Sequence, residues 1–262
     1  MKGATLVLLS VLVFAPPAAA CEVEPLDTVQ FATITDPVTI ELSDGRTLRL
    51  EGLGGPRAPS RHDGPWPMLD EATAEVRALV GDGPLLIAPT DEPDRYGRII
   101  AQAWLESGTW LNGALAARGL ARVETTLDQR RCASDALLQE AEARFAQPGM
   151  WQLSAYELRN AMETSAFTND FQIIEGRISA AEEVRGRIYL NFGTDWRDDF
   201  TVTIAPRDVR RFAESGVDPL SWADREIRVR GWLEFYNGPM IEATHPEQIE
   251  LLGGAIEDLS DE

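Results

Sequence analysis

Short apolar segments bounded by turn residues dominate the chain, and this pattern limits the folds open to it. Segments of this length, with alternating or continuous apolar residues, are typical of β-strands. The first part of the chain contains five of them, at residues 29–34, 38–42, 47–52, 85–88 and 98–105. A stretch with apolar residues at helical spacing, from Asp70 to Val80, lies between the third and the fourth. Five strands with one inserted helix predict a small closed barrel.

Two more helices are predicted after the fifth strand, at residues 110–118 and 134–145. Gly119 has the position of a C-terminal cap for the first of them. On the second helix one side is apolar and is predicted to face the core, through Leu137, Leu138, Ala141 and Phe145. Trp151 is expected to close the core of this domain.

A polar segment, residues 153–170, is predicted to be a linker to a second all-β pattern. The predicted strands of this pattern are residues 173–179, 186–192, 200–204, 227–233 and 240–243, with a helix at residues 208–214. Residues 254–262 form an acidic tail. The expected fold class is mainly β with α, that is α+β, in two domains.

The first twenty residues have the pattern of a secretory signal. Lys2 supplies a positive start, residues 4–15 are almost all apolar, and Ala18-Ala19-Ala20 is a small-residue cleavage pattern. This apolar run is too short to span a bilayer, and no later segment approaches the roughly 20 apolar residues that a membrane helix needs. We therefore expect residues 1–20 to be removed and the chain to be exported, to the periplasm or the medium, without a membrane span.

The chain contains two cysteines, Cys21 and Cys132. In an oxidising compartment two cysteines suffice for one disulfide, so this pair is a candidate. Alternatively, Cys21 carries a lipid anchor, because it directly follows a run of small residues. Against this, Ala18 stands where such signals usually carry leucine. The sequence leaves both roles of Cys21 open.

The formal net charge of the chain is −19. A nucleic-acid-binding protein normally shows a basic footprint, because affinity for the phosphate backbone comes from lysine and arginine. On average this chain repels nucleic acid, and binding would need a local patch of arginines. Nucleic acid is therefore not an expected partner.

Four motifs in the first part resemble the staphylococcal nuclease (thermonuclease) family, in order and at matching spacing. They are Arg49-Leu50-Glu51-Gly52-Leu53, Asp94-Arg95-Tyr96-Gly97-Arg98, Leu111-Asn112 with Leu115 and Gly119-Leu120-Ala121, and Glu142-Ala143-Arg144 with Gly149-Met150-Trp151. The resemblance covers residues 27–152. It implies an OB-type barrel of five strands with three helices, in agreement with the strand and helix pattern above.

The resemblance also implies a chemistry, which this sequence does not match. Members that cut DNA and RNA use Ca²⁺, which needs carboxylate ligands, and a general base that activates water. Aligned on this chain, the two metal-binding aspartates become Val38 and Gly54, and the catalytic glutamate becomes Arg57. We therefore expect no intact catalytic residues, no metal site and no cofactor. Asp36, Glu41 and Asp44 lie nearby and would be needed for a rebuilt site, but carboxylates in a turn are usually only solvated.

The two arginines that clamp phosphate in the family remain, as Arg49 and Arg98. Together with Arg57 they are candidates for binding an anion, because guanidinium groups bind phosphate through paired hydrogen bonds. The alternative is structural, with Arg49 and Arg98 paired to local acids.

Residues 171–253 resemble a C-terminal extension of some exported thermonuclease-like proteins of proteobacteria. The residues that carry this resemblance are Glu175-Gly176-Arg177, Tyr189-Leu190-Asn191-Phe192-Gly193, Asp199-Phe200-Thr201-Val202, Val229-Arg230-Gly231-Trp232 and Gly238-Pro239-Met240-Ile241-Glu242. The pattern is similar to a second OB-like barrel, a fold whose face often binds nucleic acid or sugars. Trp196, Trp232 and Tyr236 would form a stacking face there, or belong to the core.

Two hypotheses for function follow. The first is a non-hydrolytic binding or scaffolding protein of the cell envelope with a degenerate nuclease site, whose partner is unknown and is a phosphate-containing or other envelope ligand, a polysaccharide or a protein. The alternative is a nuclease or phosphodiesterase with a remodelled site. The two histidines, His62 and His245, are too far apart in sequence to form a metal motif.

Overall fold

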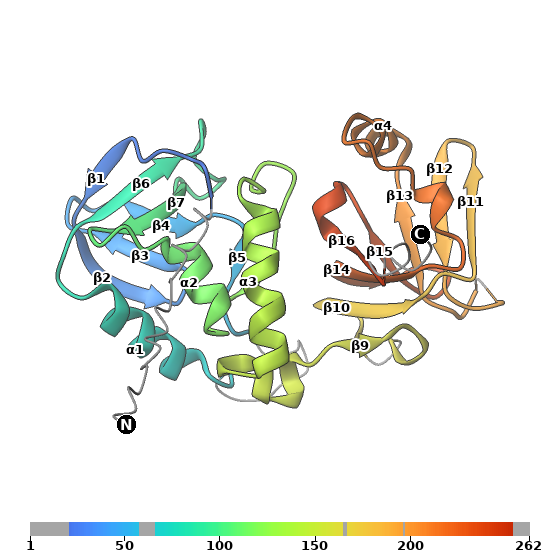
Figure 1. Cartoon of the computed structure of the whole chain (residues 1–262), viewed down its shortest axis with the longest axis horizontal. Coiled ribbons are helices and arrows are strands. Elements are labelled where there is room, and N and C mark those ends of the chain that lie inside the picture. Colours follow the sequence, from blue (N-terminus) through green and yellow to red (C-terminus); the bar gives the residue numbers. More distant parts are fainter. Residues whose placement is uncertain (1–20, 58–65, 165–166, 196, 254–262) are drawn as a thin grey trace, which may run out of the picture.

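The computed structural model describes residues 21–57, 66–164, 167–195 and 197–253. It shows a mixed α+β chain in which two curled sheets lie on either side of the long helix α3 (Ala133–Ala146) (Figure 1). We call the parts on the two sides the first domain and the second domain. No helix among the described residues is long and apolar enough to cross a membrane. The predicted export signal at residues 1–20 and the acidic tail at residues 254–262 lie outside the described residues.

The first domain is built on a six-stranded sheet with the order β1-β6-β7-β4-β3-β2. Its strands are β1 (Asp27–Val29), β2 (Phe31–Asp36), β3 (Thr39–Leu42), β4 (Thr47–Leu50), β6 (Leu85–Pro89) and β7 (Ile99–Leu105). A short pair, β5 (Leu53–Gly54) and β8 (Arg122–Val123), lies beside it. The helices are α1 (Leu69–Val80), α2 (Leu111–Ala117) and α3, so the three predicted helices are confirmed.

The prediction of a closed barrel is wrong for the described residues, since the strand pairing of the first domain leaves an open path. Its two ends, β1 and β2, pair with β6 and β3 and not with each other. Only Gln30 separates these two strands along the chain. The sheet therefore curls so that its two edge strands, β1 and β2, follow each other almost directly in the sequence. They form no ladder with each other, so the sheet stays open at this point.

The second domain repeats this path. Its strands are β10 (Asp170–Arg177), β11 (Ala180–Val184), β12 (Arg187–Asn191), β13 (Thr201–Ile204), β14 (Glu226–Phe235) and β15 (Pro239–Glu242), with α4 (Pro206–Glu214) between β13 and β14. The order β11-β12-β13-β15-β14-β10 matches β2-β3-β4-β7-β6-β1 strand for strand. Within this shared path the same pair is parallel in both domains, β4 with β7 and β13 with β15. Two added strands, β9 (Arg159–Asn160) and β16 (Ile249–Leu252), pair with β10 and β14.

The described parts of the predicted linker (residues 153–170), namely 153–164 and 167–170, pack against their neighbours. It contains the turns η2 (Ser154–Tyr156) and η3 (Ala161–Glu163) as well as β9. Tyr156 is buried and donates a hydrogen bond to the carbonyl of Pro67 in the first domain at 2.7 Å. Trp151 does not close the core of the first domain as predicted, but lies in a small apolar cluster at the junction with Tyr156 and Phe171.

The predicted apolar face of α3 is correct at Leu137, which packs against the core of the first domain, and wrong at Leu138 and Phe145. Phe145 is 93% exposed and Leu138 66% exposed, whereas Glu140 is fully buried and Arg144 nearly so. Glu140 and Arg144 are buried because their face of α3 packs against the second domain, where Arg230 of β14 donates a hydrogen bond to Glu140 at 3.0 Å. Arg230 is itself only 1% exposed and also pairs with Glu250 at 2.6 Å. Burial alone would lower the pKa of Arg230, but the two carboxylates outweigh it and raise the pKa.

Candidate functional site

The residues that the family alignment singled out, at the metal, base and phosphate-clamp positions, meet in one hollow of the first domain. We call it the arginine hollow; its volume is about 420 Å³, and its lining includes Asp36, Val38, Arg49, Gly54, Arg57 and Arg98. These residues come from the turn between β2 and β3, from β4, from the segment after it, and from the start of β7. The curl of the sheet therefore brings together positions that are up to about sixty residues apart in sequence.

Val38, one of the two positions matched to metal-binding aspartates, lies beside a carboxylate that binds the backbone. Val38 is 2% exposed and packs in the core of the first domain. Asp36, two residues earlier, accepts a hydrogen bond from the Val38 amide at 2.9 Å and so holds the turn between β2 and β3. The position that the sequence alignment matched to a metal-binding aspartate therefore holds a buried apolar side chain.

Glu124 fills the space that an aspartate at position 54 would need. A Cβ atom placed on Gly54 would lie 2.0 Å from Oε2 of Glu124 and 3.2 Å from its Cβ, so even an alanine there requires Glu124 to move. Glu124 was not predicted from the sequence, because it follows β8 and is seventy positions from Gly54. No local pattern links the two residues.

That carboxylate is neutralised by two arginines. Arg57 donates to Glu124 at 2.9 Å and 3.0 Å, and Nε of Arg122 lies 3.6 Å from it. The guanidinium of Arg57 also lies 5.1 Å from the ring centre of Trp232, which comes from β14 of the second domain. An ion pair and a ring from the second domain therefore surround Arg57, the residue that the sequence alignment matched to the family's general base. Trp232 was a candidate for a stacking face, and it does contact a cation.

Arg98 is paired as the structural alternative expects. It lies 2.6 Å from Asp94, four residues earlier, and its guanidinium lies 5.2 Å from the ring centre of Tyr96. Asp94 also accepts hydrogen bonds from the backbone amides of Tyr96 and Arg98, which closes the turn between β6 and β7. Arg98 and Arg49 line a second hollow of about 940 Å³ as well, on the side of this turn.

Arg49 is the arginine of the three that has no carboxylate within 4 Å among the described residues. It donates to the carbonyl of Leu53 at 3.0 Å and to the Thr39 hydroxyl at 3.4 Å. Burial lowers its pKa, and Asp36 opposes that effect. The arginine hollow thus holds three guanidinium groups against the single lining carboxylate of Asp36. Arg57 and Arg98 have carboxylate partners, while the two hydrogen-bond acceptors of Arg49 are neutral oxygen atoms.

The other candidate residues lie apart from this hollow or have other partners. Glu41 accepts from the Thr47 hydroxyl, and Asp44 pairs with Arg46. The part of the chain that the structure describes contains no group of three metal-binding side chains. His245 is buried between Thr125 and Thr244, and burial lowers its pKa to about 4. His62 and Trp196 lie outside the described residues.

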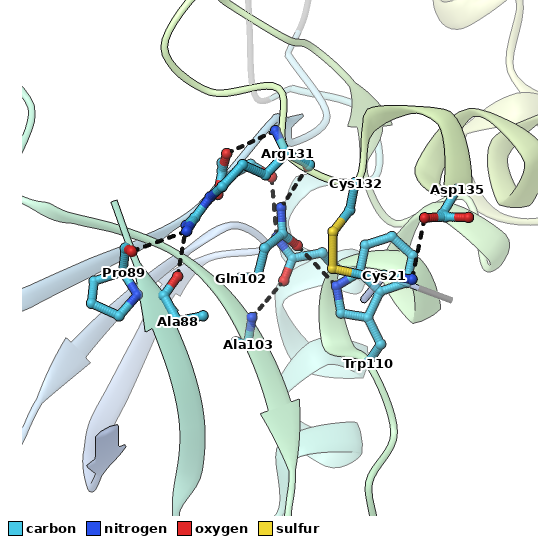
Figure 2. Close-up of a disulfide and its surroundings, with 11 residues drawn as sticks. Cys21, Ala88, Pro89, Gln102, Ala103, Trp110, Arg131, Cys132 and Asp135 are labelled. Atoms are coloured by element: carbon cyan, nitrogen blue, oxygen red, sulfur yellow. Dashed lines mark hydrogen bonds and ion pairs between the residues drawn. A yellow bond between two sulfur atoms is a disulfide. The ribbon is translucent and has the colours of Figure 1, made fainter. Parts of the chain in front are cut away.

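The predicted disulfide between Cys21 and Cys132 is confirmed. Figure 2 shows it beside the start of α3, where the backbone nitrogen of Cys21 lies 3.2 Å from Asp135. Next to it, Arg131 donates to the carbonyls of Ala88 and Pro89 at 2.7 Å and 3.1 Å. These contacts fasten the N-terminal segment and the start of α3 to the sheet. The sulfur of Cys21 is bonded to Cys132 and is not free to carry a lipid.

In the first domain, α1 is inserted between the third and the fourth long strand, and an arginine-lined hollow lies on the sheet. This strand path defines a protein with an OB-like domain. Residues 47–153 match the family model of the staphylococcal nuclease homologues. This domain of the chain belongs to that family, as the four motifs predicted. No curated protein matches the chain.

Proposed function

We propose that the protein is a non-hydrolytic binding protein of the cell envelope, built on a nuclease-family domain whose catalytic centre has been replaced by an ion pair. The observation that carries this proposal is the position of Glu124. Its carboxylate stands in the side-chain space of Gly54 and is bound by Arg57 and Arg122. A calcium ion would have to displace both arginines to use it, and no general base would remain to activate water.

The direct test is an assay of the exported chain on DNA and RNA with Ca²⁺. We expect no cleavage that depends on both a divalent ion and Arg98. Such cleavage would be lost on chelation and also in an Arg98→Ala variant. Cleavage lost under both conditions would overturn the proposal, since it would depend on a divalent ion and on the family's arginine.

A restoration series tests the role of Glu124. The variant Val38→Asp, Gly54→Asp, Arg57→Glu and Glu124→Ala should bind Ca²⁺ in calorimetry, because three carboxylates then replace the ion pair. The matched control keeps Glu124 and changes the other three residues. This control should bind more weakly, since the new aspartate at position 54 would collide with Glu124. Equal Ca²⁺ binding by both variants would show that Glu124 does not block the site.

The arginine hollow is the proposed place for an anionic ligand, with Arg49 as its first contact. The hollow has three guanidinium groups and one lining carboxylate, in a chain whose net charge is −19. A phosphate group would add paired hydrogen bonds to Arg49 that its present neutral partners do not provide. Inorganic phosphate should raise the melting temperature of the wild type, and Arg49→Gln should abolish that shift. Arg46→Gln, on an exposed turn, is the matched control.

Export is the remaining part of the proposal. It is supported by the disulfide, since such bonds persist in oxidising compartments. The backbone nitrogen of Cys21 lies 3.2 Å from Asp135, so cleavage after Ala20 would create an amino group beside a carboxylate. Mass spectrometry of the envelope fraction should find a chain that starts at Cys21 and carries no lipid. A chain with a lipid mass, or one that starts at Met1, would contradict this part.

A further inference from the structure

The second domain has a hollow of its own on the outer face of β12, β13 and β15. Its volume is about 680 Å³, which lies within the range of small-ligand sites, and it shares no lining residue with the hollows of the first domain. Its strands correspond, in the shared path, to strands that border the hollows of the first domain. The parallel pair β13 and β15 lines it, while the corresponding strands β4 and β7 line the larger first-domain hollow through Arg49 and Ile100, and β4 also lines the arginine hollow through Arg49. The repeated path therefore produces a second hollow.

The floor of this hollow is polar because the strands alternate. Ile188 and Leu190 of β12 face the core, while Tyr189 and Asn191 line the hollow. Across the ladder Tyr189 is paired with Thr203 and Asn191 with Thr201. The Thr201 hydroxyl donates to the side-chain carbonyl of Asn191 at 3.2 Å. The amide NH₂ group of Asn191 and the phenol of Tyr189 have no hydrogen-bond partner in the part of the chain that the structure describes.

The rim is formed by the turn between β14 and β15. Tyr236 lines the hollow and is 72% exposed, and Asn237 follows it in a left-handed conformation with φ of 50°. A backbone hydrogen bond from Tyr236 to Gly238 at 2.9 Å closes this turn. An aromatic ring held by a tight turn at the edge of a polar hollow offers a flat apolar surface at low entropic cost.

The charged groups of the hollow neutralise one another. Arg187 lies 2.8 Å from Glu242, and Arg207 reaches the same carboxylate at 2.9 Å. Arg187 also donates to the Thr203 hydroxyl at 3.2 Å. Glu182 is exposed on the lining and repels anions. The hollow is therefore unsuited to phosphate or to an acidic sugar, in contrast to the arginine hollow.

We propose that this hollow binds a segment of an uncharged oligosaccharide. A sugar ring has an apolar C–H face, which Tyr236 would stack against, and hydroxyl groups at its edge. Asn191, Asn237 and Tyr189 supply both donors and acceptors for such hydroxyls, as a polyol requires. The site lies outside the first domain, so this inference does not depend on whether the nuclease centre is active.

Calorimetric titration of the full exported chain tests the inference, with cellohexaose and chitohexaose as neutral probes. Oligothymidylate and oligogalacturonate serve as charged comparisons. At least one neutral probe should bind with Kd of about 1 mM or tighter, a value that stays constant when salt rises from about 50 to about 200 mM. Tyr236→Ala should weaken binding roughly five- to hundred-fold, which is the usual range for loss of one stacking ring.

Phe235→Ala is the matched control. Phe235 is the preceding residue, is 62% exposed and does not line the hollow, so its removal should leave Kd unchanged. Thermal unfolding checks that both variants remain folded. Three results would overturn the inference: no binding of either neutral probe, binding that is indifferent to Tyr236→Ala, or tighter binding of a charged comparison. None of these results would bear on the calcium experiments, which probe the first domain.

Discussion

The two domains share one strand path and differ in the side chains that fill its hollow. In the first domain the hollow is lined by Arg49, Arg57 and Arg98; in the second it is lined by tyrosines, amides and an internally neutralised ion pair. Only the first is fastened by a disulfide. The path of the sheet brings together the strands that border each hollow, while a few outward-facing residues determine what the hollow can hold.

Loss of the disulfide should have the largest effect, and it should separate the domains. A bond that closes a loop of 111 residues contributes up to about 4–5 kcal/mol in the chain-entropy model. In the Cys21→Ser, Cys132→Ser variant we expect hydrogen exchange to rise first in the first domain. Faster exchange in the second domain, with the first unchanged, would contradict a stabilising role confined to one domain.

The junction between the domains should depend strongly on Glu140. Its replacement by alanine leaves Arg230 and Arg144 buried with one carboxylate fewer, and removal of one partner of a buried pair typically costs about 3–5 kcal/mol. We expect urea to unfold the wild type in one transition and the Glu140→Ala variant in two, because the domains of the variant separate first. Glu142→Ala, on the exposed side of α3, is the control and should change the free energy of unfolding by less than about 0.5 kcal/mol.

Gly54→Ala should lower the free energy of unfolding by about 1–3 kcal/mol, because the new Cβ would collide with Glu124. Gly55→Ala is the matched control, since a Cβ there meets only Pro37 at an ordinary 3.5 Å. The double variant Gly54→Ala, Glu124→Ala should be less destabilised than the sum of its two single variants. Additive effects would mean that the two residues do not compete for space.

Near neutral pH the smallest expected effect on stability is the one that arises from His245 of the second domain, which contacts Thr125 of the first at 2.8 Å. The folded state keeps this imidazole neutral down to a pKa of about 4, whereas the unfolded chain takes up a proton near 6.5. The free energy of unfolding should therefore fall as the pH drops below 6.5, by up to about 1.4 kcal/mol per pH unit. His245→Gln should remove this part of the pH profile, and an unchanged profile would exclude His245 as its source.

Much of the fold could be predicted where local pattern decides it. The alternation along β12 and β13 identified those strands, and the spacing of apolar residues identified α1. In contrast, β11 was missed because Glu182 and Glu183 remove the apolar pattern from an exposed strand. The hollow at Arg49 and Arg57 could be predicted in part, since motif alignment brought its members together. Its decisive residue, Glu124, could not, because no local pattern links it to Gly54.

Local residue patterns were enough to predict the nuclease-family domain, the order of its longer strands and its helices, and a pair of cysteines able to bond. Tertiary structure alone decided that α3 buries Glu140 and Arg144 instead of Phe145, and that Trp232 contacts Arg57. The physical reason is distance along the chain. Strands and helices follow from neighbouring residues, whereas the partner of a buried charge, such as Arg230 for Glu140 at a separation of 90 residues, exists only once the two domains have packed.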